Sequence, residues 1–447
     1  MYSRAANIYV ANPNKPCVLV GTSPSGRRSE TMMLVNETTE ELFQQREKRV
    51  LDAIALRKPD RVPVIALFGS FPAKYCGLTC EEDANDIEKS LAANLQANID
   101  FQPDTAFPAS SIAGSLLGAL DYRQLKWAGH GLPSDHDFQS VEDDWMKADE
   151  YDEFIYDPSD FVVRKYWPRV FGKLAVLGNL PPLRHLVGYF AMPLGFMAWG
   201  LPGAAEALEA LARAGAEGLK YVHAMGAHVA QLKEAGFPVM FLAGAQPPFD
   251  LTGDFLRGRK GAIFDMYRRP EMLLASAEKM LPTAIEMGVM GARMTGNPRV
   301  FIAIHGGVEH FMSLAQYEKF FWPTFRQLLW ALVENGLNPI VLVEGGSTSR
   351  LELMADVPPG KICYVFQDVD MAKARKVLGG KVCIAGNVPL SLLALGAPDE
   401  VTEHCKRLID TMAGDGGYIL SAGGSMDDAK PENVKAMINC ARDYGVY

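Results

Sequence analysis

The residues best suited to acid–base chemistry are a histidine and a glutamate that each follow a short apolar run. His305 comes directly after VFIAI and Glu344 directly after PIVLV, and a Gly-Gly pair follows each of them. If the two runs are neighbouring parallel strands, both side chains lie at the same edge of the sheet and meet. A carboxylate beside an imidazole suits general acid–base catalysis or half of a metal site. A structural hydrogen-bonded pair, or a histidine that caps the next helix, is the alternative; the glycines, which leave room for a ligand, favour function.

Other residues follow the remaining apolar runs and are weaker candidates. Asp368 follows ICYVF, where an aspartate serves equally well as the cap of the helix that begins at DMAKARKVL. Gly424 lies in a Gly-Gly-Ser turn whose backbone N–H groups suit a carboxylate or phosphate. We also expect three residues at corresponding positions to contact the substrate: Phe71, Gln246 and Asn387.

An apolar segment from Leu186 to Ala205 contains no charged residue and is long enough to span a bilayer. Its prolines and glycines argue against a membrane span, because no second span is present to satisfy the freed backbone groups. Two interpretations remain: an internal apolar loop with a short helix, or an apolar wall over a large flat ligand. The second assigns substrate contacts to Phe190, Phe196 and Trp199.

The elements that must position these residues form a regular series in the C-terminal third. Five β-then-α units joined by short turns predict parallel strands covered by helices. No G-x-G-x-x-G turn occurs, which favours a closed (β/α)8 TIM barrel over an open doubly wound sheet. Further strands are expected near Val62, Thr105 and Val239. We therefore predict an N-terminal arm (1–37) and a barrel (38–447) that carries a long βα-loop insertion at about 114–189.

Composition narrows the class of protein. The 447 residues carry a net charge of −9, and no Lys/Arg block could track a phosphate backbone, so a dedicated nucleic-acid binder is not expected. Seven scattered cysteines without a C-x-x-C pair are typical of a reducing compartment. The first residues show no charged-then-apolar signal peptide. These features predict a cytoplasmic enzyme.

Four segments together resemble the uroporphyrinogen decarboxylase superfamily: HGGVEHFMSLAQYEKFFWPTF, VEGGSTSRLELM, KVCIAGNVPLSLLALGAPDEV and GGYILSAGGSMDDAKPENVKAMINCARDYG. The resemblance runs from about Leu42 to the C-terminus and is strongest from Val300 onward. It implies a (β/α)8 barrel, in agreement with the count of β-then-α units.

Departures from the family pattern separate its branches. The true decarboxylases hold substrate carboxylates with an R-Q-A-G-R segment and a histidine after the last strand, where this chain has IALFGSFPAKY and Gly423-Gly424. The methyltransferases that act on thiols hold zinc through an H-x-C pair and a later cysteine. The matching positions here are Val343, Gly345 and Gly424, so the thiolate ligands are absent.

The resemblance therefore implies the methyl-donor side of this chemistry: transfer of a methyl group from a methoxylated, often aromatic, small molecule to a Co(I) corrinoid (cobalamin). No D-x-H-x-x-G motif occurs, so the corrinoid is expected on a partner protein. Glu344 with His305 would protonate the departing oxygen or hold a metal such as zinc in a site without thiolates. Two alternatives stay open, a corrinoid-independent decarboxylase or lyase and a non-catalytic corrinoid-binding module. A homodimer, common in the family, also stays open.

Overall fold

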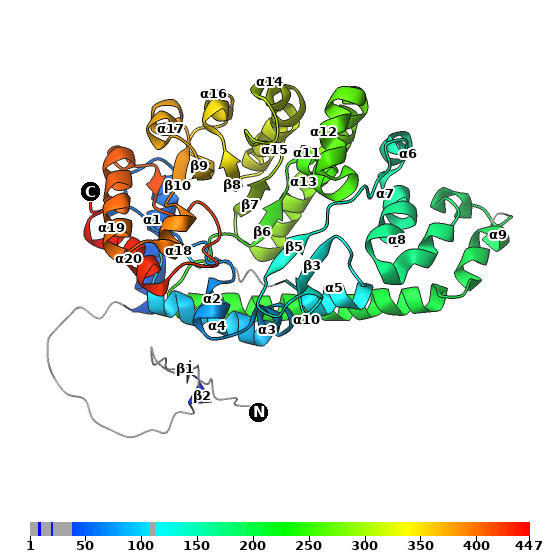
Figure 1. Cartoon of the computed structure of the whole chain (residues 1–447), viewed down its shortest axis with the longest axis horizontal. Coiled ribbons are helices and arrows are strands. Elements are labelled where there is room, and N and C mark those ends of the chain that lie inside the picture. The colour runs from blue at the N-terminus through cyan, green and yellow to red at the C-terminus, as the bar shows by residue number, and fades with distance from the viewer. Residues whose placement is uncertain (1–7, 10–18, 21–37, 108–111, 191) are drawn as a thin grey trace.

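The computed structural model describes residues 8–9, 19–20, 38–107, 112–190 and 192–447, and its main feature is a ring of parallel strands (Figure 1). Six of its strands form one continuous sheet. Three parallel bridges close this sheet into the ring: Val64 with Leu420, Ile65 with Thr105 and Ala106 with Val239. Since Val239 leads into the first sheet strand, the described residues form an α/β barrel with eight strand positions, and the predicted strands near Val62, Thr105 and Val239 are confirmed. The six strands of the sheet are β6 (Ala243–Ala245), β7 (Arg299–Ile304), β8 (Asn338–Gly346), β9 (Cys363–Asp368), β10 (Cys383–Gly386) and β11 (Tyr418–Ile419).

Helices cover the outside of the ring and fill its connections. Before β7 these are α1 (Thr39–Ile54), α2 (Phe71–Tyr75), α3 (Cys80–Asn85), α4 (Ile87–Phe101), α10 (Ala204–Glu234), α11 (Pro248–Asp250), η5 (Leu251–Arg257), α12 (Arg259–Arg268) and α13 (Pro270–Thr295). After β7 they are α14 (Leu314–Gln316), η6 (Tyr317–Phe321), α15 (Trp322–Glu334), η7 (Thr348–Arg350), α16 (Leu351–Met354), α17 (Met371–Leu378), α18 (Leu390–Leu395), α19 (Pro398–Met412) and α20 (Pro431–Asp443). Near the N-terminus, β1 (Ile8–Tyr9) pairs antiparallel with β2 (Leu19–Val20).

Local signals in the sequence explain where the helices begin and break. Thr38 caps α1 in a capping box with Glu41, each side chain bonding the other residue's backbone N–H. The helical stretch that runs from α14 to α15 is interrupted just before Pro323, because a proline removes a backbone donor and crowds the preceding turn. The interruption takes the form of the π-helical segment η6.

Two apolar layers hold the barrel together. Side chains that point inward from the strands form a small interior cluster, and those that point outward form a much larger layer beneath the helices. At the N-terminal end of the strands, the fully buried Asp104 accepts hydrogen bonds from Arg49 (2.6 Å), Arg61 (2.8 Å) and the backbone N–H of Val64 (2.8 Å). Polar clusters at this end of a barrel serve stability, since the opposite end carries the loops that form the site.

A lobe with its own small core projects from one side of the barrel (Figure 1). The helix α10 connects the two parts: at 31 residues it is about 46 Å long, and it packs on α4 of the barrel as well as on α5 and η2 of the lobe. The other elements of the lobe are α5 (Gly114–Leu120), β3 (Leu125–Ala128), β4 (Gly131–Leu132), β5 (Phe138–Ser140), α6 (Tyr151–Tyr156), α7 (Pro158–Phe161), η1 (Val162–Tyr166), α8 (Trp167–Val170), η2 (Gly172–Asn179), η3 (Leu183–Leu186), α9 (Met192–Phe196) and η4 (Met197–Gly200).

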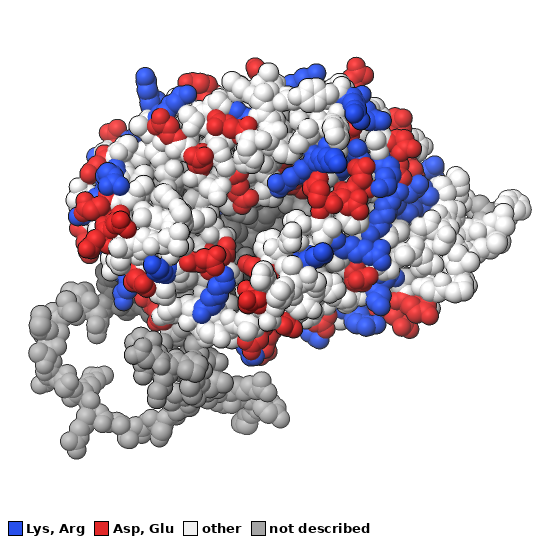
Figure 2. Space-filling view, viewed as in Figure 1, with Lys and Arg blue, Asp and Glu red and all other residues white. Residues whose placement is uncertain are grey.

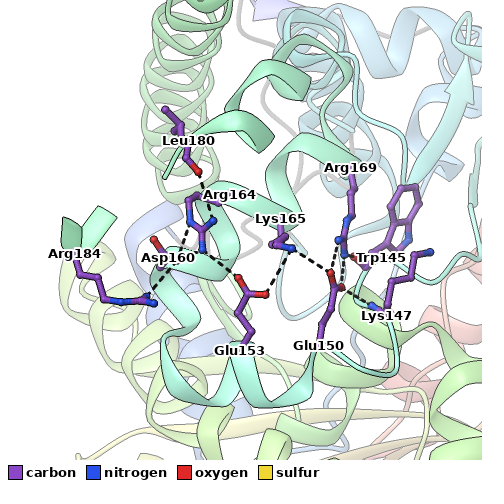
Figure 3. A network of polar contacts seen from close by, with 10 residues as sticks. All are labelled: Trp145, Lys147, Glu150, Glu153, Asp160, Arg164, Lys165, Arg169, Leu180 and Arg184. Atoms are coloured by element: carbon purple, nitrogen blue, oxygen red, sulfur yellow. Dashed lines mark hydrogen bonds and ion pairs between the residues drawn. The ribbon is translucent and has the colours of Figure 1, made fainter. Parts of the chain in front are cut away.

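A chain of ion pairs ties the helices of the lobe to one another (Figure 3). Glu150 accepts two hydrogen bonds of 2.6 Å from Arg169, and Lys165 lies 3.6 Å from both Glu150 and Glu153. Arg164 joins Glu153 to the buried Asp160, to which it donates at 2.6 Å. These acidic residues, which lie within the segment predicted as an insertion (about 114–189), therefore hold α6, α7 and α8 together.

The apolar segment 186–205 lies at the far end of this lobe, with α9 at the right edge of Figure 1, away from the barrel strands. Phe190 is 85% exposed and Phe196 is 50% exposed, whereas Trp199 packs against the core of the lobe. The predicted wall over a ligand is therefore not what the structure shows, because a run of apolar residues does not reveal on which side of a fold it will lie. In the described part of the chain, no helix has the length and apolar character that a membrane span requires.

Candidate functional site

His305 and Glu344 meet at the carboxyl end of the barrel, as predicted. Side chains alternate along a strand, so His305 continues the inward face of β7 that carries Phe301, and Glu344 continues the inward face of β8. Ile304 pairs with Val343 across the two strands, which places the next two residues side by side. The Nε2 atom of His305 lies 3.5 Å from an Oε atom of Glu344.

Two aspartates that follow β6 complete the cluster around His305. The Nδ1 atom of His305 is 2.6 Å from an Oδ atom of Asp254. Asp250 accepts hydrogen bonds from the backbone N–H groups of His305 (3.0 Å) and Gly306 (2.9 Å). Asp254 thus orients the ring, and the buried Asp250 holds the backbone beneath it.

Asp254, which lies close to Asp250 in the chain, is a site residue that sequence reasoning missed. The two lie four residues apart in PFDLTGDF, at the end of α11 and within the π-helical segment η5. Residues at this spacing lie on one helix face, so the pattern D-x-x-x-D next to a strand end was the available signal.

The carboxylates change the protonation of His305. Burial lowers the pKa of His305, but its hydrogen bond with Asp254 and the negative charges of Asp250, Asp254 and Glu344 outweigh burial and raise the pKa to about 9. Burial, followed by the charge of Asp254, raises the pKa of Asp250. Below about pH 9 the imidazole is therefore a cation with a proton on both nitrogens.

A buried arginine fixes the loop that follows His305. Arg350 is 3% exposed and donates to the carbonyl oxygens of Gly307, Val308 and Met312. His310, at the end of the same loop, packs against Gly345: a Cβ atom added to this glycine would lie 2.7 Å from the imidazole Cε1. The glycine next to Glu344 is thus needed for this close approach.

A cavity of about 610 Å³ is lined by residues from elements that also carry the cluster. It shares β7 with His305 and the segment η5 with Asp254, and the surface is hollowed near the middle of the ring of helices in Figure 2. Gln246 is a predicted substrate contact that lines this cavity. The cavity is bounded by Gly244, Ala245, Gln246, Leu251, Phe255, Met287, Phe301 and Ala303.

The other predicted residues lie around the same end of the barrel with different outcomes. Asp368 is on the face of β9 that also carries Tyr364 and Phe366 of the outer layer, so the structure does not bring its side chain to His305. Its neighbour Gln367 takes the inward direction instead, because successive side chains alternate. The side chain of Asn387 donates to the carbonyl oxygen of Val369 at 3.4 Å.

Two predicted substrate contacts are enclosed by protein. Phe71 is 2% exposed and packs against Phe68 and Phe101, so it belongs to the core and not to a binding surface. Gly424 is buried, and a Cβ atom there would lie 3.7 Å from the amide nitrogen of Gln367. Gln367, which sequence reasoning did not select, therefore covers the turn that was expected to bind an anion.

The donor set for a metal differs from that of a thiolate site. Val343 is buried against the outer layer, and Gly345 and Gly424 have no side chain to offer. Asp250, Asp254 and His305 instead provide carboxylate and imidazole donors within 4.8 Å of one another. Such a set suits a divalent cation such as zinc. A cation would fit here only by displacing the proton between His305 and Asp254.

Comparisons with known proteins agree with this architecture. The uroporphyrinogen decarboxylase of Geobacter metallireducens is 32% identical over 216 residues, which cover 45% of this chain and 59% of that protein. The uroporphyrinogen decarboxylase of Syntrophotalea carbinolica is 28% identical over 209 residues, with the same shares. The chain thus matches about three fifths of the length of these curated relatives.

Two methyltransferases are also similar. The methylcobamide:CoM methyltransferase MtbA of Methanosarcina acetivorans is 27% identical over 129 residues, covering 29% of this chain and 37% of that protein. The structure of a methyltransferase from Methanosarcina mazei superposes with a TM-score of 0.59 at 14% identity, covering 91% of this chain and 99% of that one, and so shares the fold.

The family model described as uroporphyrinogen decarboxylase (URO-D) matches residues 202–444, a span that contains β6 to β11 and the whole cluster around His305. Because this match takes in more than half of the chain, the protein belongs to the uroporphyrinogen decarboxylase (URO-D) family.

Proposed function

We propose that this protein is the methyltransferase component of an O-demethylase, which moves a methyl group from a methoxylated small molecule to the Co(I) corrinoid of a partner protein. One observation carries the proposal: His305 stands between Asp254 and Glu344 at the mouth of the barrel, where these carboxylates and Asp250 outweigh burial and raise its pKa to about 9. The similarity to a methylcobamide-dependent methyltransferase and the missing thiolate ligands support the donor side of the reaction.

The chemistry explains why a proton is needed. The corrinoid, when its carrier docks, supplies a strong nucleophile that accepts the methyl group. The oxygen that remains is a poor leaving group, and a proton delivered as the methyl group departs makes it a neutral alcohol or phenol. In this protein His305 delivers that proton from Nε2, while Asp254 holds Nδ1 and keeps the ring in place.

Glu344 assists at the outer side of the ring. Its carboxyl group lies 3.5 Å from Nε2 of His305 and its side chain is 44% exposed, so it faces both the imidazole and the open end of the barrel. In this position it steers the Nε2 proton toward the mouth and returns a proton from solvent after each cycle. A group partly open to water is suited to this exchange, which the buried Asp250 is not.

A corrinoid-independent decarboxylase is the second candidate, and the names of the curated relatives favour it. Its substrate would bring carboxylates to a mouth that already carries Asp250, Asp254 and Glu344. Carboxylates in close proximity repel one another, so such a substrate needs cationic partners. Arg259 contacts this cluster but is already paired with Asp254 at 3.2 Å. It is therefore not a free cationic partner for a substrate carboxylate.

The test is a single-turnover reaction with reduced cobalamin as the acceptor and a panel of aryl methyl ethers as donors. We expect formation of methylcobalamin with one equivalent of the phenol, and a loss of about 10²–10⁴-fold in His305→Gln. The control is His223→Gln, which alters an exposed histidine on α10 and should react at the wild-type rate. Release of CO2 from a carboxylated substrate without corrinoid would instead establish the decarboxylase. If Glu344→Ala still binds the ligand, and the wild-type protein turns over no substrate, the protein is a non-catalytic corrinoid-binding module.

A further inference from the structure

The cavity lined by Phe301, Ala303 and Gln246 has the chemical character of a site for an uncharged ring. Among the described residues, all eight that line it are uncharged, and Gln246 is the one of these eight with a polar side chain. Its volume of about 610 Å³ lies within the range of small-molecule sites.

Aromatic side chains already form a stack at the wall of the cavity. Phe301 is stacked on Phe241 with ring centroids 4.5 Å apart, and Phe241 meets Phe107 edge to face at 4.9 Å. Phe255 lines the same cavity from η5. A planar ring bound here extends an existing stack, an arrangement that aromatic pairs prefer.

The charges at the mouth determine what substituents this ring can carry. The carboxylates of Asp250 and Asp254 lie within 4.8 Å of a ring nitrogen of His305, and that of Glu344 lies 3.5 Å from its Nε2 atom. Arg259 is committed to Asp254, and Arg350 is buried beneath the loop with carbonyl partners. A carboxylate on the substrate would therefore meet like charges without a free cation among the described residues of the cluster and cavity.

We propose that the methyl donor is an uncharged methoxyarene that lacks a carboxylate, with its ring against Phe301 and its hydrogen-bonding substituent at the amide of Gln246. This inference rests on the proposed function, because it names the donor of that same reaction. It places the ether oxygen toward His305, on the inward face of β7 that Phe301, Ala303 and His305 share.

The experiment compares two donors that differ by one carboxylate: 2-methoxyphenol and 4-hydroxy-3-methoxybenzoate. Calorimetry measures their binding to the whole protein, and methyl transfer to cob(I)alamin gives kcat/KM. We expect the uncharged donor to be favoured at least about 100-fold, because placing like charges together costs several kcal/mol. Gln246→Leu and Phe301→Ala should each weaken binding of 2-methoxyphenol about 10-fold or more. Gln327→Leu on the exposed surface of α15 is the matched control and should leave binding unchanged.

The outcomes separate the inference from the proposed function. If the carboxylated donor binds and reacts as well as 2-methoxyphenol, the inference is overturned while the methyltransferase function stands. If neither donor reacts but 2-methoxyphenol binds and Gln246→Leu weakens it, the binding site is supported and the proposed function fails. If 2-methoxyphenol does not bind, or if both cavity variants bind it like wild type, the inference is overturned.

Discussion

Replacing Asp254 with asparagine tests whether this residue keeps His305 protonated. The substitution preserves the shape of the side chain but removes the negative charge that lies 2.6 Å from Nδ1. The pKa of His305 should then fall from about 9 toward its ordinary value of 6.5, because the largest favourable contribution is lost while burial remains.

The size of the effect depends on pH in a way that can be calculated. At pH 8, an imidazole is about 90% protonated if its pKa is near 9 and about 3% protonated if its pKa is near 6.5. Methyl transfer that needs the imidazolium should therefore fall about 30-fold in Asp254→Asn at pH 8 and less than about 2-fold at pH 6. In the wild type the rate should fall only as the pH rises through about 9, where the raised pKa removes the proton.

The assay is the pH profile of kcat/KM for methyl transfer to reduced cobalamin, recorded for both proteins. Asp356→Asn provides a control, since Asp356 pairs with Arg326 at 2.6 Å and is not part of the cluster. Its profile should match that of the wild type. An equal loss of rate in Asp254→Asn at pH 6 and at pH 8 would show that Asp254 does not act through the protonation of His305, because a purely structural defect is independent of that protonation.

Three further predictions follow from the fold and the site. Asp104→Ala should lower the free energy of unfolding by about 3–5 kcal/mol in urea titrations, because it leaves Arg49 and Arg61 without their buried partner; a change below about 1 kcal/mol would contradict this role. Phe190→Ser should leave methyl transfer within about 2-fold of wild type, since this side chain is exposed and precedes α9 in the chain; a loss of about 10-fold or more would restore a role in ligand binding. Treatment with a chelator, followed by metal analysis, should leave the rate unchanged because His305 supplies a proton; loss of activity that zinc restores would show that a metal at Asp250, Asp254 and His305 activates the ether.

The parts of the fold that depend on local pattern could be predicted from the sequence. The strands from Val300 onward and the helices between them follow from short apolar runs and capping residues, and α17 and α19 are two of the helices that the β-then-α pattern requires. The contact between His305 and Glu344 was predictable for the same reason, because adjacent parallel strands end at one edge of the sheet.

Features that depend on one residue of register, or on the path of a loop, could not be predicted. Asp368 and Gln367 are neighbours at the end of β9, and the exact alternation of the strand decides which of them points inward. Asp254 reaches His305 through the π-helical turn of η5, a geometry that periodicity does not specify. The segment 186–205 is apolar whether it is buried or exposed, so its composition alone could not place it at the end of the lobe.

Transfer of a methyl group to a corrinoid can be followed in the absorption spectrum of reduced cobalamin during reaction with 2-methoxyphenol and other aryl methyl ethers. We expect wild-type protein to convert Co(I) to the methylated corrinoid with release of one phenol per cobalt, and His305→Gln to do so at least about 100-fold more slowly. No spectral change with any donor in the panel, or an equal rate in His305→Gln, would contradict this expectation.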